Sequence, residues 1–314
     1  MGTMPTFQVD GPVRPESRMI GRAQTLVDLY DRLARSGQNT LLLSPRRTGK
    51  TSVALACLDR IRNNGGLAAD LDLSSSAVSS GASLADEMAR QARAIGLSSV
   101  GPNAVRRWAS KVRSQAKSTR EAMNLMGLRN YSELPEAISQ ALAPVDGATK
   151  LSEVLRATNA ALVLADQNLV VLLDEIQEVS KWEDSTSVQS QIAETMRLPE
   201  SRINFLFAGS EESSVATLFV EGSPLYYAGV SFSLPQISHD DWSVGIQRRF
   251  DELGTPIAPA LVADVLRSSG GHPQRTMRVC FHIEEWCKRT STAEVDDTTV
   301  RRAITDARGH PSWR

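Results

Sequence analysis

A nine-residue stretch between two apolar segments constrains the fold of this chain more than any other feature. Residues 39–44 (NTLLLS) are typical of a buried strand, and residues 49–63 have the apolar spacing of a helix. Between them lies SPRRTGKTS, residues 44–52, which is rich in small residues and positive charge. A strand that enters a helix through such a loop points successive backbone N–H groups, and the positive end of the helix, toward one place. The stretch therefore predicts a binding site for phosphate groups.

The loop matches the phosphate-binding consensus GxxxxGK[ST] at every fixed position except the first. Ser44 replaces the first glycine, where a small residue is tolerated, whereas Gly49 must let the backbone approach phosphate without a Cβ. Lys50 is expected to neutralise the β and γ phosphates of a nucleotide, and the Thr51 hydroxyl is expected to bind Mg²⁺. The predicted nucleotide-binding residues of the loop are Ser44, Pro45, Arg46, Arg47, Thr48, Gly49, Lys50, Thr51 and Ser52.

A second motif, LVVLLDEIQEV at residues 169–179, brings two acidic residues to the end of an apolar run. Acidic side chains at the end of a buried strand are costly unless they meet a cation. Asp174 is suited to hold Mg²⁺ through its water shell, and Glu175 to orient and deprotonate the water that attacks the γ-phosphate. With Lys50, these acids predict hydrolysis of the nucleotide rather than binding alone.

Two further stretches are weaker signals. INFLFAGS places Ser210 just past another apolar run, where its hydroxyl could sense the γ-phosphate beside Asp174, although a plain turn serine explains it equally well. SGGHPQRT, residues 269–276, opens a helix at Pro273 and could close over the nucleotide, with Arg275 reaching the phosphates. A helix start that needs glycine and proline is the alternative explanation.

The order of apolar segments predicts an α/β fold. Short apolar runs at 39–44, 67–73, 169–174, 203–209 and 230–234 alternate with helical stretches, which is typical of a parallel sheet flanked by helices. After residue 235 the pattern is helical only, with segments near 240–253, 258–269, 273–290 and 294–307. We therefore predict a P-loop NTPase fold with an irregular arm (1–18), a nucleotide-binding domain (19–235) and a C-terminal all-helical lid domain (236–314).

A helical insertion at about 83–165 interrupts the predicted nucleotide-binding domain and carries a basic stretch. From Arg90 to Arg120 there are eight basic residues and no acidic one. The phosphate backbone of nucleic acid is one partner for such a stretch, and a solvated helix face or an acidic protein surface is the alternative. The basic residues proposed to bind nucleic acid are Arg106, Arg107, Lys111, Arg113, Lys117 and Arg120.

Composition narrows the classes of protein that fit. Thirty-five basic and 36 acidic residues leave a formal charge of −1, so the overall balance does not call for nucleic acid or an anionic membrane. The three cysteines lack the paired spacing of a zinc site or a disulfide framework. No apolar run approaches the roughly 18 residues of a membrane helix, and the N-terminus lacks the apolar core of a secretory signal. We expect a cytoplasmic protein without a membrane partner.

In their order along the chain, these motifs resemble the signatures of the archaeal-type ATPase family, which belongs to the P-loop group that includes the STAND switches and the AAA+ proteins. The matching stretches are MIGRAQTLVDL (19–29), SPRRTGKTS, LLDEIQEV, FAGS, SPLY (223–226) and SGGHP. The resemblance spans residues 19 to about 307, except for most of 95–165. It implies an AAA+-like (ASCE) nucleotide-binding domain in which Ile20, Gly21 and Arg22 pack near adenine. It also implies that the lid moves against this domain as the nucleotide changes.

The sequence departs from this family in ways that bear on mechanism. The family usually continues SPLY with Gly-Arg, whereas this chain has Tyr227 and Ala228. No Lys or Arg occurs from Ile203 through Gln247, where ring-forming relatives usually carry the arginine that reaches into a neighbour's site. An arginine of this kind can accelerate hydrolysis by roughly 10³- to 10⁵-fold. We therefore expect slow basal turnover.

The sequence as a whole predicts an Mg²⁺-dependent ATPase that binds ATP and ADP and works as a molecular switch on a protein partner. Two alternatives remain at this point. One is a DNA-binding AAA+ ATPase of the initiator or transposition-regulator type, whose homo-oligomer would grip DNA. The other is a nucleotide-binding scaffold that does not hydrolyse ATP.

Overall fold

A computed structural model of the chain describes residues 6–14, 16–99, 134–143, 150–198, 200–210 and 218–313. The basic residues from Arg106 to Arg120 lie outside this set. The chain divides into two compact units. The sheet unit comprises Leu29–Ser44 and Cys57–Ser233, and the helical unit comprises the residues up to Asp28, Pro45–Ala56 and Leu234–Arg314. The domain boundaries at 18/19 and 235/236 stay a prediction.

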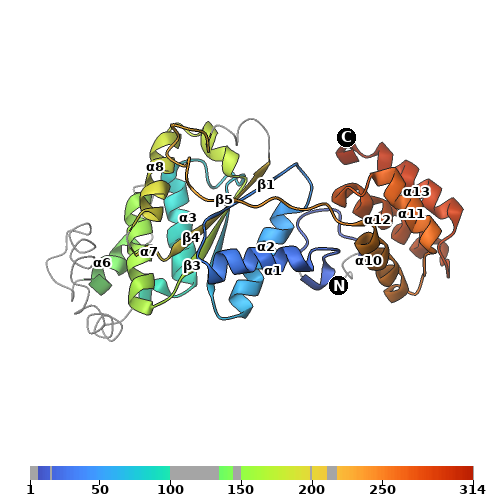
Figure 1. The fold of residues 1–314 in the computed structure, drawn as a ribbon, viewed down its shortest axis with the longest axis horizontal. Helices are drawn as coiled ribbons and strands as arrows, with labels where there is room; N and C mark the ends of the chain where they lie inside the picture. The colour runs from blue at the N-terminus through green and yellow to red at the C-terminus, as the bar shows by residue number, and fades with distance from the viewer. Residues whose placement is uncertain are drawn as a thin grey trace. The chain divides into compact units, whose positions relative to one another are not determined.

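The sheet unit is built on a five-stranded sheet of order β2-β3-β4-β1-β5 in which every pairing is parallel (Figure 1). The strands are β1 (Thr40–Ser44), β2 (Leu67–Asp72), β3 (Leu169–Asp174), β4 (Ile203–Ser210) and β5 (Val230–Ser231). The predicted parallel sheet is confirmed, although the fifth strand is shorter than the predicted run to residue 234. Because all the strands run the same way, their carboxyl ends meet at one edge of the sheet.

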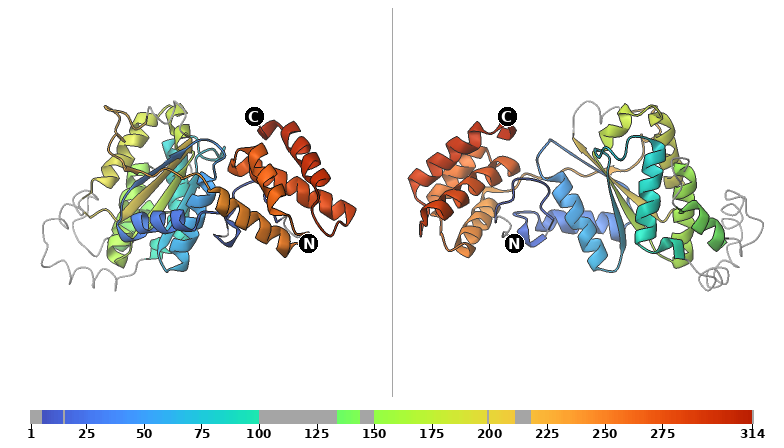
Figure 2. Two further views of the ribbon diagram at one scale, coloured as in Figure 1. Left: turned by 45° about the vertical axis from the view of Figure 1, so that its right-hand side comes forward. Right: turned by 180° about the vertical axis from the view of Figure 1, so that it is seen from behind.

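Helices cover both faces of this sheet (Figures 1 and 2). On one face lie α3 (Gly81–Ala94), α7 (Leu151–Ala165) and α8 (Ser185–Met196), and α6 (Leu134–Ala141) packs on α7. On the other face lie the sheet-unit residues of α1 (Ala23–Tyr30) and α2 (Lys50–Asn63), in which Leu29, Leu58 and Ile61 are buried, together with Leu33 of the segment that follows α1. A five-residue π-helix, Asp31–Arg35, continues α1.

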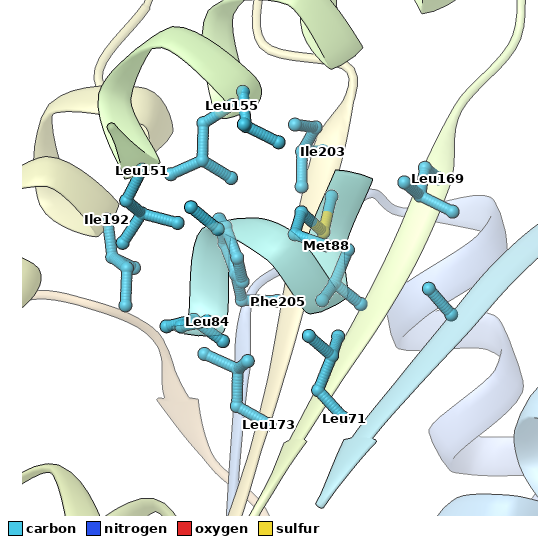
Figure 3. Close-up of a cluster of buried hydrophobic side chains, with 14 of the residues drawn as sticks. Leu71, Leu84, Met88, Leu151, Leu155, Leu169, Leu173, Ile192, Ile203 and Phe205 are labelled. Carbon is cyan, nitrogen blue, oxygen red and sulfur yellow. The ribbon is translucent and has the colours of Figure 1, made fainter. Parts of the chain in front are cut away.

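Side chains of the central strands alternate between the two faces with the period of a strand. Leu71, Leu173 and Phe205 belong to a core cluster with residues of α3, α7 and α8, as Figure 3 shows. Val170 and Leu206 are also buried but lie outside this cluster. Both faces of the sheet are therefore buried, which accounts for the nearly continuous apolar runs in the sequence.

The helical unit contains four helices after the sheet: α10 (His239–Glu252), α11 (Pro259–Ser269), α12 (Pro273–Thr290) and α13 (Asp297–Gly309). Each of these helices begins with a capping side chain or a proline, which are common at helix N-termini. The Ser238 side chain accepts a hydrogen bond from the Asp241 N–H, Asp296 accepts one from the Thr299 N–H, and α11 and α12 each begin with proline. The predicted all-helical C-terminal region is confirmed. In the part of the chain that the structure describes, no helix is both long and apolar enough to cross a bilayer.

The N-terminal arm is seated in the core of the helical unit. Phe7 is fully buried, and its ring centroid lies 4.8 Å from that of Phe250. The backbone N–H groups of Thr6 and Phe7 both donate to the Glu284 carboxylate at 3.1 Å. The Arg249 guanidinium lies over the Phe7 ring, 5.4 Å from its centroid. The arm also contains one short 3₁₀ helix, Glu16–Arg18. No local pattern in the sequence indicates the attachment of Thr6 and Phe7 to Glu284.

Candidate functional site

Three polar residues are buried at the carboxyl edge of the sheet. Ser44 ends β1 and pairs in register with Ser210, which ends β4, while Asp174 ends the neighbouring strand β3. All three are almost completely shielded from solvent. Burying polar groups costs free energy unless they gain partners. This edge therefore carries the polar side chains that the sequence predicted there.

The Ser210 hydroxyl is the clearest sign that something else belongs at this edge. Its residue is 2% exposed, and its Oγ has no hydrogen-bond partner in the described part of the chain. An unpaired buried hydroxyl costs about 1–3 kcal/mol, so it suits a site where a ligand oxygen or an ordered water completes the contact. The position fits the predicted role of Ser210 as a γ-phosphate sensor, and that role stays a prediction.

Glu175 turns the chain sharply at the end of β3. It adopts the left-handed conformation, with φ 55° and ψ 44°, which is uncommon outside glycine. Its backbone N–H donates to Asp174 Oδ1 at 3.0 Å. A short 3₁₀ helix, Ile176–Lys181, begins directly after it, and within that helix the Gln177 side-chain amide donates to Glu175 Oε2. Asp174, the predicted Mg²⁺ ligand, and Glu175, the predicted base, are thus consecutive residues. Their carboxylates accept hydrogen bonds from different donors, the Glu175 N–H and the Gln177 amide.

The predicted phosphate-binding loop follows directly on Ser44 and belongs to the helical unit. Gly49 has φ +94°, and an added Cβ would meet no atom within 4 Å. The glycine is thus required by the backbone conformation and not by crowding. The Pro45 carbonyl accepts hydrogen bonds from Thr48 Oγ1 and from Lys50 Nζ, both at 2.9 Å. The loop therefore folds back on itself with the ammonium group resting on a loop carbonyl.

Helix α2 begins at Lys50, so Thr51 and Ser52 lie in its first turn. The first N–H groups of a helix have no partner within it, and the helix dipole places partial positive charge there. Lys50 is only 6% exposed, so its charge adds to this positive end from within the structure. The Ser52 hydroxyl is used differently, because it accepts a hydrogen bond from the Val13 N–H of the arm at 3.0 Å. The first turn of α2 is therefore suited to an anion.

Arg22 connects this loop, through hydrogen bonds, to the segment that precedes α10. Its guanidinium donates to the Thr48 carbonyl at 3.2 Å and to the Pro235 carbonyl at 2.6 Å. The side chain is buried, and burial lowers the pKa of Arg22 below its usual value. The resemblance placed Arg22 near adenine, whereas its observed contacts are carbonyls of the loop and of the segment before α10. The sequence offered no signal for these contacts.

A cleft of about 740 Å³ lies beside this arginine within the helical unit. Gly21 forms part of its wall with φ +62°, and a Cβ there would approach Ile237 Cγ2 to 2.6 Å. Ile20 is buried and packs closely against Gly245 of α10. The cleft is lined by Glu16, Ser17, Met19, Gly21, Arg22, Ala23, Gln24 and Asp241. It is large enough for a nucleobase, and the assignment of Ile20 to Arg22 to adenine stays a prediction.

The start of α12 faces the same loop. His272 precedes Pro273, the first residue of α12, and its imidazole forms a hydrogen bond with the backbone of Arg46. Its Nδ1 is buried without a partner among the described residues. Arg275, predicted to reach phosphate, lies over the Trp313 ring, 5.7 Å from its centroid. The sequence offers no signal for the contact of His272 with Arg46, because a single histidine carries no ligand-like spacing.

His272 and His282 should make the protein less stable in mild acid. Burial lowers the pKa of His272, and the nearby Arg275 and Arg47 lower it further, while the Arg46 backbone opposes this. The folded state therefore binds this proton less readily than the unfolded state, whose histidine pKa is about 6.5. The stabilisation is fully present above about pH 6.5 and is lost as pH falls from that value through the lower folded-state pKa. Urea unfolding at pH 7.5 and 5.5 should give a lower midpoint at pH 5.5.

The variant His272→Gln isolates this contribution, since glutamine keeps a hydrogen-bond donor but does not titrate. Its urea midpoint should fall less between pH 7.5 and 5.5 than that of the wild type. The pKa of His282 is also lowered, mainly by burial, so His282→Gln should show a smaller acid effect as well. Equal acid slopes in the wild type and in both variants would contradict this explanation.

Comparison with known proteins identifies the family. The sequence profile of the AAA ATPase domain matches residues 18–208, which is more than half of the chain. The chain belongs to the AAA ATPase family. No curated protein sequence matches this AAA ATPase significantly. The expected P-loop ATPase family is confirmed.

Solved structures agree with this assignment at the level of the fold. The AAA ATPase is similar to the Walker-type ATPase PABY2304 of Pyrococcus abyssi, with 17% identity and a TM-score of 0.63 over 97% of this chain and 76% of that chain. It is similar to the ORC2 protein of Aeropyrum pernix, with 15% identity and a TM-score of 0.60 over 97% and 71%. The Aeropyrum pernix ORC1 protein in complex with DNA shows 16% identity and a TM-score of 0.53 over 92% and 65%.

Proposed function

We propose that this AAA ATPase binds and hydrolyses ATP as a molecular switch. The observation that carries the proposal is the run from a buried strand through the loop into a helix: Ser44 ends β1, Gly49 has positive φ, and Lys50 begins α2. The N–H groups of this first turn and the Lys50 ammonium would bind the phosphates. On binding, the ammonium would exchange the Pro45 carbonyl for phosphate oxygens.

Thr51 and Asp174 are the residues proposed to hold Mg²⁺. Magnesium keeps several waters and is typically bound through one or two carboxylates together with substrate phosphates. Asp174 suits this pattern, because it supplies one carboxylate at the end of β3. When bound, Mg²⁺ would neutralise charge that develops on the phosphates.

Glu175 is the proposed general base, because it follows Asp174 at the strand end and carries a carboxylate that can accept a proton from water. Ser210 would hydrogen-bond the γ-phosphate or the attacking water through its unpaired hydroxyl. Arg275 and Pro273 at the start of α12 are proposed to take part on the lid side. These assignments follow the chemistry of the side chains and the resemblance to the family.

We expect the isolated protein to turn over slowly and to act on a protein partner that completes the site. The reason is the absence of any Lys or Arg from Ile203 through Gln247 in the sequence. Single-turnover hydrolysis of radiolabelled ATP by the purified protein should proceed well below about 1 s⁻¹, the low end for typical enzymes. A faster rate without any partner would contradict an incomplete site.

A DNA-binding ATPase is the second candidate, and the basic stretch between Arg90 and Arg120 favours it. The structural similarity to an ORC1 protein in complex with DNA points in the same direction, although it speaks for the fold alone. Binding through phosphate contacts weakens steeply as salt increases. A gel-shift titration with duplex DNA at 50 mM and 200 mM salt tests this candidate, and no binding at 50 mM would eliminate it.

A further inference from the structure

The contact between Gln177 and Glu175 carries an inference about how the proposed base is held. Gln177 is 4% exposed, and its Nε2 donates to Glu175 Oε2. The amide orientation is fixed by chemistry, because an amide oxygen turned toward a carboxylate would bring two acceptors together. The carboxylate of Glu175 therefore has one anchored oxygen.

The other carboxylate oxygen of Glu175 is open. Within the described residues, Glu175 Oε1 has no hydrogen bond, so it can accept one from water. A glutamate side chain has three rotatable bonds, and fixing them costs free energy during the reaction unless the protein has already fixed them. The anchored oxygen sets the direction in which the open one points. This is the arrangement that a general base requires.

Backbone geometry supports the same interpretation. The left-handed conformation of Glu175 breaks the strand direction, and the 3₁₀ helix that follows brings residue 177 back to the side chain of residue 175. Ser180 Oγ donates to the Gln177 carbonyl at 2.7 Å, which holds this turn. A non-glycine residue is held in such a conformation at a cost in free energy. We interpret this strained conformation as the means by which the turn brings the side chains of Glu175 and Gln177 together.

Stability alone does not explain a glutamine at position 177. Its Oε1 is buried with no partner in the described part of the chain, and such an unsatisfied acceptor destabilises the folded state. Methionine would occupy a similar volume without that cost. Of the Gln177 side-chain amide, therefore, only the NH₂ group, which donates to Glu175, has a hydrogen-bond partner among the described residues.

We propose that Gln177 is the positioning residue for Glu175, holding one carboxylate oxygen so that the other is directed to the attacking water. This inference rests on the proposed function, in which Glu175 is the base. It predicts that Gln177→Met lowers the single-turnover rate of ATP hydrolysis by about 10- to 100-fold, the effect of losing orientation at a reacting group. The affinity for ATP should change by less than about twofold, because Gln177 is not one of the residues proposed to bind the nucleotide.

Three measurements separate positioning from a structural role. The nucleotide-free Gln177→Met protein should be at least as stable to urea as the wild type, since the unsatisfied amide oxygen is gone. Gln189→Met is the matched control: Gln189 is buried on α8 and donates to Ser185 Oγ at 3.0 Å, so its loss should lower stability but leave turnover unchanged. In a double-mutant cycle, Gln177→Met should add nothing once Glu175 is glutamine.

The outcomes are distinguishable. If the wild type shows no turnover, the proposed function itself fails. If Glu175→Gln leaves turnover intact, Glu175 is not the base, and the assignment on which this inference rests fails. If Glu175→Gln abolishes turnover while Gln177→Met retains or exceeds the wild-type rate, the positioning role is overturned. Should Gln177→Met not fold, Gln177→Asn serves instead, because it keeps the amide one methylene too short to reach Glu175. The same loss of turnover at unchanged ATP affinity is then expected, and wild-type turnover in Gln177→Asn would equally overturn the role.

Discussion

Replacing Lys50 with alanine should weaken ATP binding about 100-fold. The ammonium is buried at the first residue of α2 and already rests on a loop carbonyl, so it is held where phosphate would bind. A hydrogen bond between charged groups contributes about 1.5–3 kcal/mol, and about 2.8 kcal/mol corresponds to 100-fold in affinity. Titration of a fluorescent ATP analogue, followed by anisotropy, measures the change directly.

Two controls give this experiment its meaning. Lys150→Ala removes a lysine whose side chain is 75% exposed and should leave affinity unchanged. Lys50→Arg keeps the charge but changes its shape and should give an intermediate affinity. The melting temperature of Lys50→Ala shows whether the fold is intact. Wild-type affinity in a folded Lys50→Ala protein would show that the loop does not hold the phosphates.

Replacing Glu175 with glutamine should lower turnover by about 10²- to 10⁴-fold, the range that general base catalysis contributes. Glutamine has nearly the same shape as glutamate but cannot take a proton from water. ATP affinity should persist, so the variant should accumulate as an ATP-bound form. Single-turnover hydrolysis and the ratio of bound ATP to ADP after incubation provide the two readings.

Glu178→Gln is the matched control for this substitution. Glu178 lies in the same 3₁₀ helix and forms an ion pair with Lys181 at 2.7 Å, so its loss should leave hydrolysis unchanged. Wild-type turnover in Glu175→Gln would remove Glu175 from the mechanism. If the wild type itself binds ATP without hydrolysing it, the non-hydrolysing scaffold becomes the better description.

The fold was predictable because it follows local patterns. Continuous apolar runs at β1, β3 and β4 report strands buried on both faces, and the prolines and side-chain caps of the C-terminal region mark where its helices begin. The strand-to-helix loop before Lys50 was predictable because its residues match a known consensus at fixed spacing, and its binding of phosphate stays a prediction. Helix α8 was not predicted, since its serine- and threonine-rich start gives a weak apolar pattern.

The contacts that hold the candidate site in place could not be predicted from the sequence. Arg22 reaches carbonyls 26 and 213 residues away, and the arm amides reach Glu284 across 277 and 278 residues. Hydrogen bonds between a side chain and a distant backbone group produce no periodic pattern in the sequence. Gln177 was missed for a different reason, because a glutamine near two acidic residues looks like an exposed polar side chain until its burial is known.

The most direct test of the central claim is a crystal structure of the protein with a non-hydrolysable ATP analogue and Mg²⁺. The account predicts phosphates bound by the backbone N–H groups at the start of α2, with Lys50 Nζ on the β and γ phosphates. It also predicts Mg²⁺ on Thr51 Oγ1, with Asp174 holding it through water. An analogue bound elsewhere, or an Asp174 with no part in metal binding, would contradict it.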